Sequence, residues 1–120
     1  MGSFAASQLA GLASCAEVTI RTAKHPHTPV VIWIVVDDGD VFVRSVKGGK
    51  GRWFRDLDGG GEAILEWDGR RVPVTAIPAT DAESAARASR QYLAKYRTSP
   101  YAEPMTRADV LPTTLRLEPR

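Results

Sequence analysis

The residues best suited to binding a ligand lie in one glycine-rich, basic loop near the middle of the chain. In the stretch SVKGGKGRW, residues 45–53, the cations Lys47, Lys50 and Arg52 alternate with glycines, and an indole follows directly. Glycines let backbone N–H groups approach an anion, and cationic side chains strengthen each hydrogen bond to it. The stretch lacks the G-x-G-x-x-G fingerprint of dinucleotide sites and the Gly-Lys-Ser/Thr ending of a Walker loop. Two interpretations remain open: a phosphate site that also uses the hydroxyl of Ser45, or a solvated turn.

Three tryptophans lie on or beside the expected strands, and large aromatic residues usually belong to the core. Trp33 and Trp67 are therefore expected in the core. Trp53 follows the basic loop directly, so we expect it to cover a planar ring whose phosphate lies on that loop.

The remaining reactive residue types give weaker signals. His25 and His27 stand in one loop, but two histidines without a third ligand at suitable spacing make a poor metal site, and none is predicted. Cys15 is the single cysteine, which excludes an internal disulfide, and no G-x-S-x-G elbow occurs. Catalytic residues are therefore left unassigned, and any chemistry is expected to come from a bound cofactor.

Bulk composition indicates one globular domain covering residues 1–120. The chain is 43% hydrophobic and 25% charged with a net charge of +2, and no apolar run reaches the length of a membrane helix. The N-terminus lacks the basic start and continuous apolar core of a signal peptide, so a cytoplasmic protein is expected. The basic residues Arg87, Lys95 and Arg97, expected on the helix over 82–97, indicate a solvated face, so nucleic-acid binding is not expected.

Hydrophobic periodicity predicts mainly β structure. Residues 17–22, EVTIRT, alternate as a half-buried strand, whereas residues 30–36, VVIWIVV, are apolar throughout and predict a central strand covered on both faces. Residues 41–46 alternate again, and Asp38-Gly39 predicts a tight hairpin between the last two strands.

The second half of the chain adds a hairpin, a long helix and a last strand. The hairpin is expected over residues 63–67 and 71–77 around Asp68-Gly69, with Pro73 indicating an edge or a bulge. Further expected elements are a leading helix over 4–14 within segment 1–16, a helical turn over 52–57, a strand over 113–117, and a helix over 82–97 capped by Asp81. One apolar stripe is expected along that helix, made of Ala85, Ala88, Tyr92 and Tyr96. Hairpins favour an antiparallel sheet, and curling it into a barrel removes exposed edges. We therefore expect a barrel of about six or seven mostly antiparallel strands, with residues 17–77 supplying most of them.

The order of these segments resembles the flavin-binding split β-barrel superfamily, typified by pyridoxamine phosphate oxidase and the deazaflavin-dependent nitroreductases. The resemblance rests on EVTIRT, a loop ending in Thr-Pro, VVIWIVV, the DGD hairpin, VFVRSV and KGGKGRWFRDL. Within that superfamily, the chain is similar to a family of short uncharacterised bacterial proteins, through VRSVKG-G-RW, the Lys-Tyr pair at 95 and 96, and the closing TTLRL.

This resemblance implies a flavin nucleotide, a homodimer with cofactor sites at its interface, and an FMN-dependent oxidoreductase acting on a small organic substrate. The short AKHPH segment at 23–27 favours FMN over a deazaflavin coenzyme, and a cofactor-free binding or structural module of the same fold is the alternative. The implied cofactor-binding residues are Thr28, Pro29, Ser45, Lys47, Lys50, Arg52 and Trp53.

Overall fold

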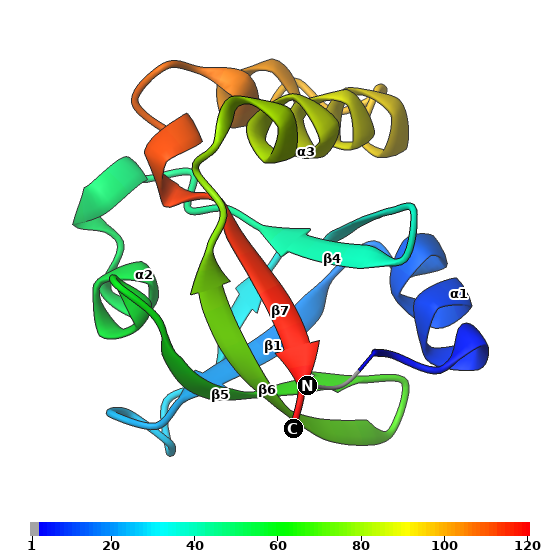
Figure 1. Ribbon diagram of the computed structural model, residues 1–120, viewed down its shortest axis with the longest axis vertical. Coiled ribbons are helices and arrows are strands. Elements are labelled where there is room, and N and C mark those ends of the chain that lie inside the picture. Colours follow the sequence, from blue (N-terminus) through cyan, green and yellow to red (C-terminus); the bar gives the residue numbers. More distant parts are fainter. Residues whose placement is uncertain (1–2) are drawn as a thin grey trace.

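The protein forms one curled antiparallel sheet with three α-helices around it, as the computed structural model of residues 3–120 shows (Figure 1). The strands are β1 (Val18–Thr22), β2 (Val30–Ile32), β3 (Val35–Asp37), β4 (Asp40–Val43), β5 (Gly61–Trp67), β6 (Arg70–Pro78) and β7 (Leu115–Pro119). The α-helices are α1 (Ala6–Ser14), α2 (Arg52–Leu57) and α3 (Ala82–Lys95), and three short 3-10 helices are η1 (Gly48–Lys50), η2 (Glu103–Thr106) and η3 (Leu111–Thr113). The expected mainly β fold, a barrel of about six or seven mostly antiparallel strands with flanking helices, is confirmed as a half-barrel of seven antiparallel strands.

The connection between β2 and β3 requires the sheet to curl. The strand order is β2-β1-β5-β6-β7-β4-β3, so these two strands occupy opposite edges. A flat sheet of this size would place its edges about 29 Å apart at roughly 4.8 Å per strand spacing. The two-residue link through Trp33 and Ile34 spans only about 10 Å. The two edges must therefore come close together, which gives the barrel-like shape.

Both predicted hairpin turns are confirmed by their backbone angles. Asp38 and Gly39 have φ of 48° and 82°, and Asp68 and Gly69 have φ of 50° and 72°. Two successive positive φ values are the signature of the type I′ turn, whose twist matches that of antiparallel strands. The Asp-Gly pairs thus set the β3–β4 and β5–β6 registers.

The apolar run over residues 30–36 is not the single central strand that the sequence predicts. It breaks at Trp33 and Ile34, and its two halves pair with different neighbours, β1 and β4. Side chains of α3 and the following residue satisfy the backbone at the break: Lys95 Nζ donates to Ile34 O at 2.7 Å, and Ile34 N donates to Tyr96 Oη at 3.3 Å. Val31 is 61% exposed, so β2 is not covered on both faces.

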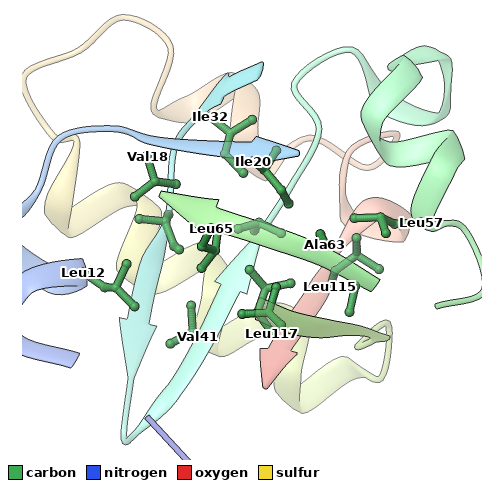
Figure 2. Packing of buried hydrophobic residues seen from close by; sticks show 14 of the residues in the cluster. Leu12, Val18, Ile20, Ile32, Val41, Leu57, Ala63, Leu65, Leu115 and Leu117 are labelled. Carbon is green, nitrogen blue, oxygen red and sulfur yellow. The ribbon is translucent and has the colours of Figure 1, made fainter. Parts of the chain in front are cut away.

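Two hydrophobic clusters lie on opposite faces of the curled sheet. The barrel interior is closed from two sides by Leu12 of α1 and Leu57 of α2, which point inward in Figure 2. The second cluster packs α3 against β3 and β4 through the predicted stripe that includes Ala88 and Tyr92. The Asp81 cap is confirmed by its hydrogen bond from Ser84 N at 3.0 Å.

Pro73 does not mark an edge strand, because β6 lies between β5 and β7. The β6–β7 pairing ends at Val74 and Pro119, and Arg120 N donates to Pro73 O at 2.9 Å. Since N and O of one strand residue point the same way, the missing N–H of Pro73 faces the side where β7 ends.

None of the helices in residues 3–120 has the length and apolarity to cross a bilayer. The cytoplasmic location stays a prediction.

Candidate functional site

A cleft of about 540 Å³ opens where the two strands of the β3–β4 hairpin separate. The hairpin pairs Val35 with Phe42. Continuing that register would place residues 30–33 opposite residues 44–47. Instead, residues 30–32 pair with β1, and the chain after Val43 leaves the sheet. These two separated segments form facing walls of the cleft. On the edge of β2 that faces away from β1, the N–H and C=O groups of every second residue therefore have no strand partner.

The cleft has a basic end and an acidic end. Lys47 and Arg52 lie at one end, and Arg52 belongs to α2, which is tied to the C-terminal end of β1 through Thr22 and Asp56. Glu17, which precedes the first residue of β1, lines the other end. Glu17 and Thr22 are five residues apart along β1, which corresponds to about 17 Å at 3.3 Å per residue. The remaining lining is Val30, Val31, Ile32, Trp33, Arg44, Ser45, Val46, Gly51, Trp53, Tyr101 and Met105.

The structure brings four of the predicted site residues to the cleft and leaves three outside its walls. Ser45, Lys47, Arg52 and Trp53 line it together. The other three, which are exposed and do not line it, are Thr28, Pro29 and Lys50.

The glycine-rich loop is tightly packed, although its basic side chains face solvent. Gly48 is buried with φ of +63°, a conformation that favours glycine, and Gly48 N donates to Ser45 O at 2.9 Å. Gly51 lies against the side chain of Ser45, so that a Cβ at position 51 would overlap with the serine hydroxyl oxygen. Ser45 N donates in turn to Thr113 Oγ1 at 3.0 Å. These contacts fix the backbone of the loop, which places Ser45 and Lys47 in the lining of the cleft.

Arg52 is held by a carboxylate behind the cleft wall. Its Nη1 donates to Asp56 Oδ2 at 3.4 Å, and the same oxygen accepts from Thr22 Oγ1 at 2.7 Å and contacts His25 Nδ1 at 2.6 Å. Burial by itself would raise the pKa of Asp56, but the hydrogen bonds from Thr22 and His25, together with the charges of His25 and Arg52, lower it overall. Asp56 is therefore a carboxylate at neutral pH. His25, treated in the sequence only as a weak metal candidate, belongs to this network.

Arg44 is a buried member of the cleft that the sequence analysis missed. It is 1% exposed and donates to Thr114 Oγ1 and Ser89 Oγ at 2.8 Å, to Ala85 O at 2.7 Å and to Met105 O at 3.0 Å. Within residues 3–120 no carboxylate forms an ion pair with it. Burial lowers the pKa of this guanidinium. The sequence contained one indication of this burial: Arg44 follows Phe42 by two residues in an alternating strand, so both lie on the same face.

Trp33 is a second aromatic residue of the cleft, beside the predicted Trp53, and is the more exposed of the two. Trp33 is half-buried at the cleft wall and stacks on Tyr96, with ring centroids 3.8 Å apart and planes 3° apart. Trp53 is only 7% exposed and belongs to the barrel interior while touching the cleft. Trp67 is buried, as expected. Tyr96 Oη also donates to Ala16 O at 2.7 Å, which fixes the stack in place.

Exposed apolar side chains gather around the mouth of the cleft. Among residues 3–120, four large hydrophobic side chains are exposed, and three of them line this cleft: Val31 at 61%, Val46 at 52% and Tyr101 at 63%. Apolar groups left open to water around a concave site are typical of a surface that something else covers. The combination of aromatic and apolar walls with cations at one end suits a planar ligand that carries an anionic group.

Solved structures of similar shape include two bacterial proteins. One, from Jannaschia sp. CCS1 and assigned as general stress protein 26, has a TM-score of 0.64 and 14% identity, with 92% of this chain and 70% of that chain covered. The other, a conserved hypothetical protein of Mycobacterium tuberculosis, has a TM-score of 0.60 and 15% identity, with 95% of this chain and 78% of that chain covered. At such identities the likeness shows the fold alone. No curated protein matches the sequence. A family model matches residues 8–117, and the chain therefore belongs to DUF2255, a family described as uncharacterized proteins conserved in bacteria.

Proposed function

We propose that the cleft binds FMN and that the protein is an FMN-dependent oxidoreductase acting on a small organic substrate. The observation that carries the proposal is the division of one cleft into an aromatic, apolar wall and a cationic end. Its volume of about 540 Å³ lies within the range of small-molecule sites. A flavin mononucleotide has the same division, with an apolar planar ring at one end and a phosphate at the other.

The donors at the cationic end fit a phosphate. Lys47 and Arg52 supply charge-assisted hydrogen bonds, and the hydroxyl of Ser45 supplies a neutral donor beside them. The buried charge of Arg44 adds to the positive potential of the cleft, because no described carboxylate pairs with it.

The apolar wall fits a planar ring. Trp33 is held rigidly by its stack on Tyr96, while Val31, Val46 and Tyr101 can cover a ring and exclude water from it. When bound, a flavin supplies hydride transfer. The roles of this chain are to orient the ring, anchor the phosphate and keep the reacting face dry.

We further propose that a second copy of the chain covers the mouth of the cleft. The exposed apolar groups Val31, Val46 and Tyr101 support this proposal. A homodimer that buries them would shield from water three of the four large hydrophobic side chains that are exposed in residues 3–120. Sedimentation of the wild type against Val46→Glu/Tyr101→Glu tests it: the variant is expected to be a monomer. A monomeric wild type at tens of micromolar would refute the dimer.

Cofactor binding is tested by the visible spectrum of the purified protein and by thermal unfolding with FMN, FAD, a deazaflavin coenzyme or no addition. A ligand at 100 times its dissociation constant adds about 2.7 kcal/mol, which raises the melting temperature by on the order of 10 °C for a domain of this size. Lys47→Ala/Arg52→Ala should abolish the shift. The matched control Arg70→Ala/Arg97→Ala, which removes the same charge from exposed positions outside the cleft, should keep it.

Each outcome has a distinct meaning. A shift with FMN that the cleft variant abolishes and the control retains supports the proposal. A shift confined to the deazaflavin would transfer the proposal to that cofactor. A colourless protein that none of these compounds stabilises would refute flavin binding and favour a cofactor-free module of the same fold.

A further inference from the structure

We propose that Asp56 positions Arg52 for the phosphate of the ligand, so that a hydrogen bond behind the cleft, from Thr22 to Asp56, sets the preference for phosphorylated ligands. Neither Thr22 nor Asp56 lines the cleft. The inference rests on the proposed FMN site and adds to it two residues that act through Arg52 without touching the ligand.

The contacts form a chain from the barrel wall to the ligand site. Thr22 is the last residue of β1 and is 3% exposed, so its hydroxyl is fixed by the sheet. It donates to Asp56 Oδ2 at 2.7 Å, an oxygen that His25 Nδ1 also contacts at 2.6 Å, and the side chain of Asp56 is 8% exposed. Arg52 lies four residues earlier on α2 and donates to the same oxygen at 3.4 Å. Thr22 therefore fixes the position of the Asp56 carboxylate, and the carboxylate in turn restricts the side chain of Arg52.

An arginine at a cleft needs this kind of support to bind well. The side chain of Arg52 is 35% exposed and, left alone, would sample many rotamers whose restriction opposes binding. One N–H held by a fixed carboxylate restricts the guanidinium before the ligand arrives and leaves other N–H groups of the planar fork free. Such preorganisation raises affinity without adding a contact to the ligand.

Asp56 also has an opposing effect, which decides the choice of variant. Its negative charge repels a phosphate, so Asp56→Asn would mix a loss of positioning with a gain in electrostatic attraction. Thr22→Val separates the two effects, because valine has the shape of threonine but no hydroxyl, and no charge changes. Thr22→Ser is the matched control, since it keeps the hydroxyl that donates to Asp56.

The experiment compares the dissociation constants of FMN and riboflavin, measured by quenching of flavin fluorescence. Riboflavin has the same ring but no phosphate. Thr22→Val is expected to weaken FMN about three- to tenfold while riboflavin changes less than twofold, and Thr22→Ser should leave both close to wild type. In an Arg52→Ala background, Thr22→Val should have no further effect on FMN, because the residue it positions is gone.

Two results would overturn the inference. One is an equal weakening of FMN and riboflavin by Thr22→Val, which would show general damage to the cleft. The other is a loss of FMN affinity that persists in the Arg52→Ala background. If Thr22→Val fails to fold, Asp56→Glu displaces the carboxylate without changing the charge, and the same selective loss of FMN affinity is expected. Wild-type protein that binds neither flavin would instead refute the proposed function, and this inference with it.

Discussion

The packing of Gly51 against Ser45 makes a quantitative prediction about the loop that borders the cleft. In Gly51→Ala, the added Cβ would overlap with the hydroxyl oxygen of Ser45, whereas its next contacts, Ser45 Cβ at 3.6 Å and Gly48 O at 3.8 Å, are ordinary. Overpacking of this kind costs about 1–3 kcal/mol. Backbone strain does not contribute, because Gly51 has φ of −63° and ψ of 130°, which any residue adopts.

Two smaller effects of the substitution nearly cancel. Alanine reduces the conformational entropy of the unfolded chain, which stabilises the fold by about 0.4–1 kcal/mol. Gly51 is also the N-cap of α2, where alanine is less favourable than glycine by a similar amount. Gly51→Ala alone should therefore lower the free energy of unfolding by about 1–3 kcal/mol. In a Ser45→Ala background, where the overlapping oxygen is absent, the same substitution should change it by less than about 0.5 kcal/mol.

Urea unfolding of the wild type, the two single variants and the double variant measures both steps. Since about 1 kcal/mol corresponds to roughly 4 °C in a domain of this size, thermal melts provide an independent check. An equal loss in both backgrounds would show that the Ser45 hydroxyl is not what Gly51 contacts. A neutral Gly51→Ala would show that the Ser45 side chain can rotate away from position 51, and would refute a fixed contact between the two residues.

Three further predictions concern polar contacts in other parts of the fold. Arg44→Lys keeps the charge but cannot reach all four acceptors of the guanidinium, so urea unfolding should show a loss of about 2–4 kcal/mol; a neutral result would contradict the hydrogen bonds described above. Lys95→Met removes the Nζ group that donates to Leu12 O and Ile34 O and should cost about 1–3 kcal/mol, with a red shift of tryptophan fluorescence if the strand break loosens; unchanged stability would contradict this role. Hydrogen bonds from Arg87 and Gln91 lower the pKa of Asp37, so the stabilisation is complete above the unfolded pKa near 3.9 and is lost as the pH falls through the folded value. Asp37→Asn should therefore flatten the fall in stability below about pH 5, and an unchanged profile would exclude Asp37 as a source of it.

The parts of the fold that the sequence predicted well are those determined by local chemistry. Asp38-Gly39 and Asp68-Gly69 carry the positive φ values of a type I′ turn within two residues, and the Asp81 cap and the stripe on α3 are equally local. These features required no knowledge of which strands become neighbours.

The break in the run VVIWIVV could not be predicted in the same way. Whether an apolar segment stays with one pair of neighbours or changes partners depends on the closure of the whole sheet, which brings its two edges together at Trp33 and Ile34. The side chains that stabilise the break, Lys95 as a hydrogen-bond donor and Tyr96 as an acceptor, come from about 60 residues later in the chain. Hydrophobic periodicity contains no information about the closure of the sheet or about these distant hydrogen-bond partners.

The candidate site shows the same difference between features set by local sequence and features set by the tertiary fold. Ser45, Lys47, Arg52 and Trp53 were predicted together because they are neighbours in sequence, and the structure places them along one cleft. Trp33 on the facing wall and Tyr101 at the mouth come from distant segments, and their place in the site was missed.

Two-dimensional amide NMR of the protein titrated with FMN shows whether the ligand binds in this cleft. FMN should shift the backbone signals of residues 30–33, 44–47 and 51–53 and the indole signal of Trp33. The indole signal of Trp67, which is buried and does not line the cleft, should move little. Shifts that map to another face of the barrel, or spectra that FMN leaves unchanged at millimolar concentration, would contradict the assignment of this cleft as a flavin site.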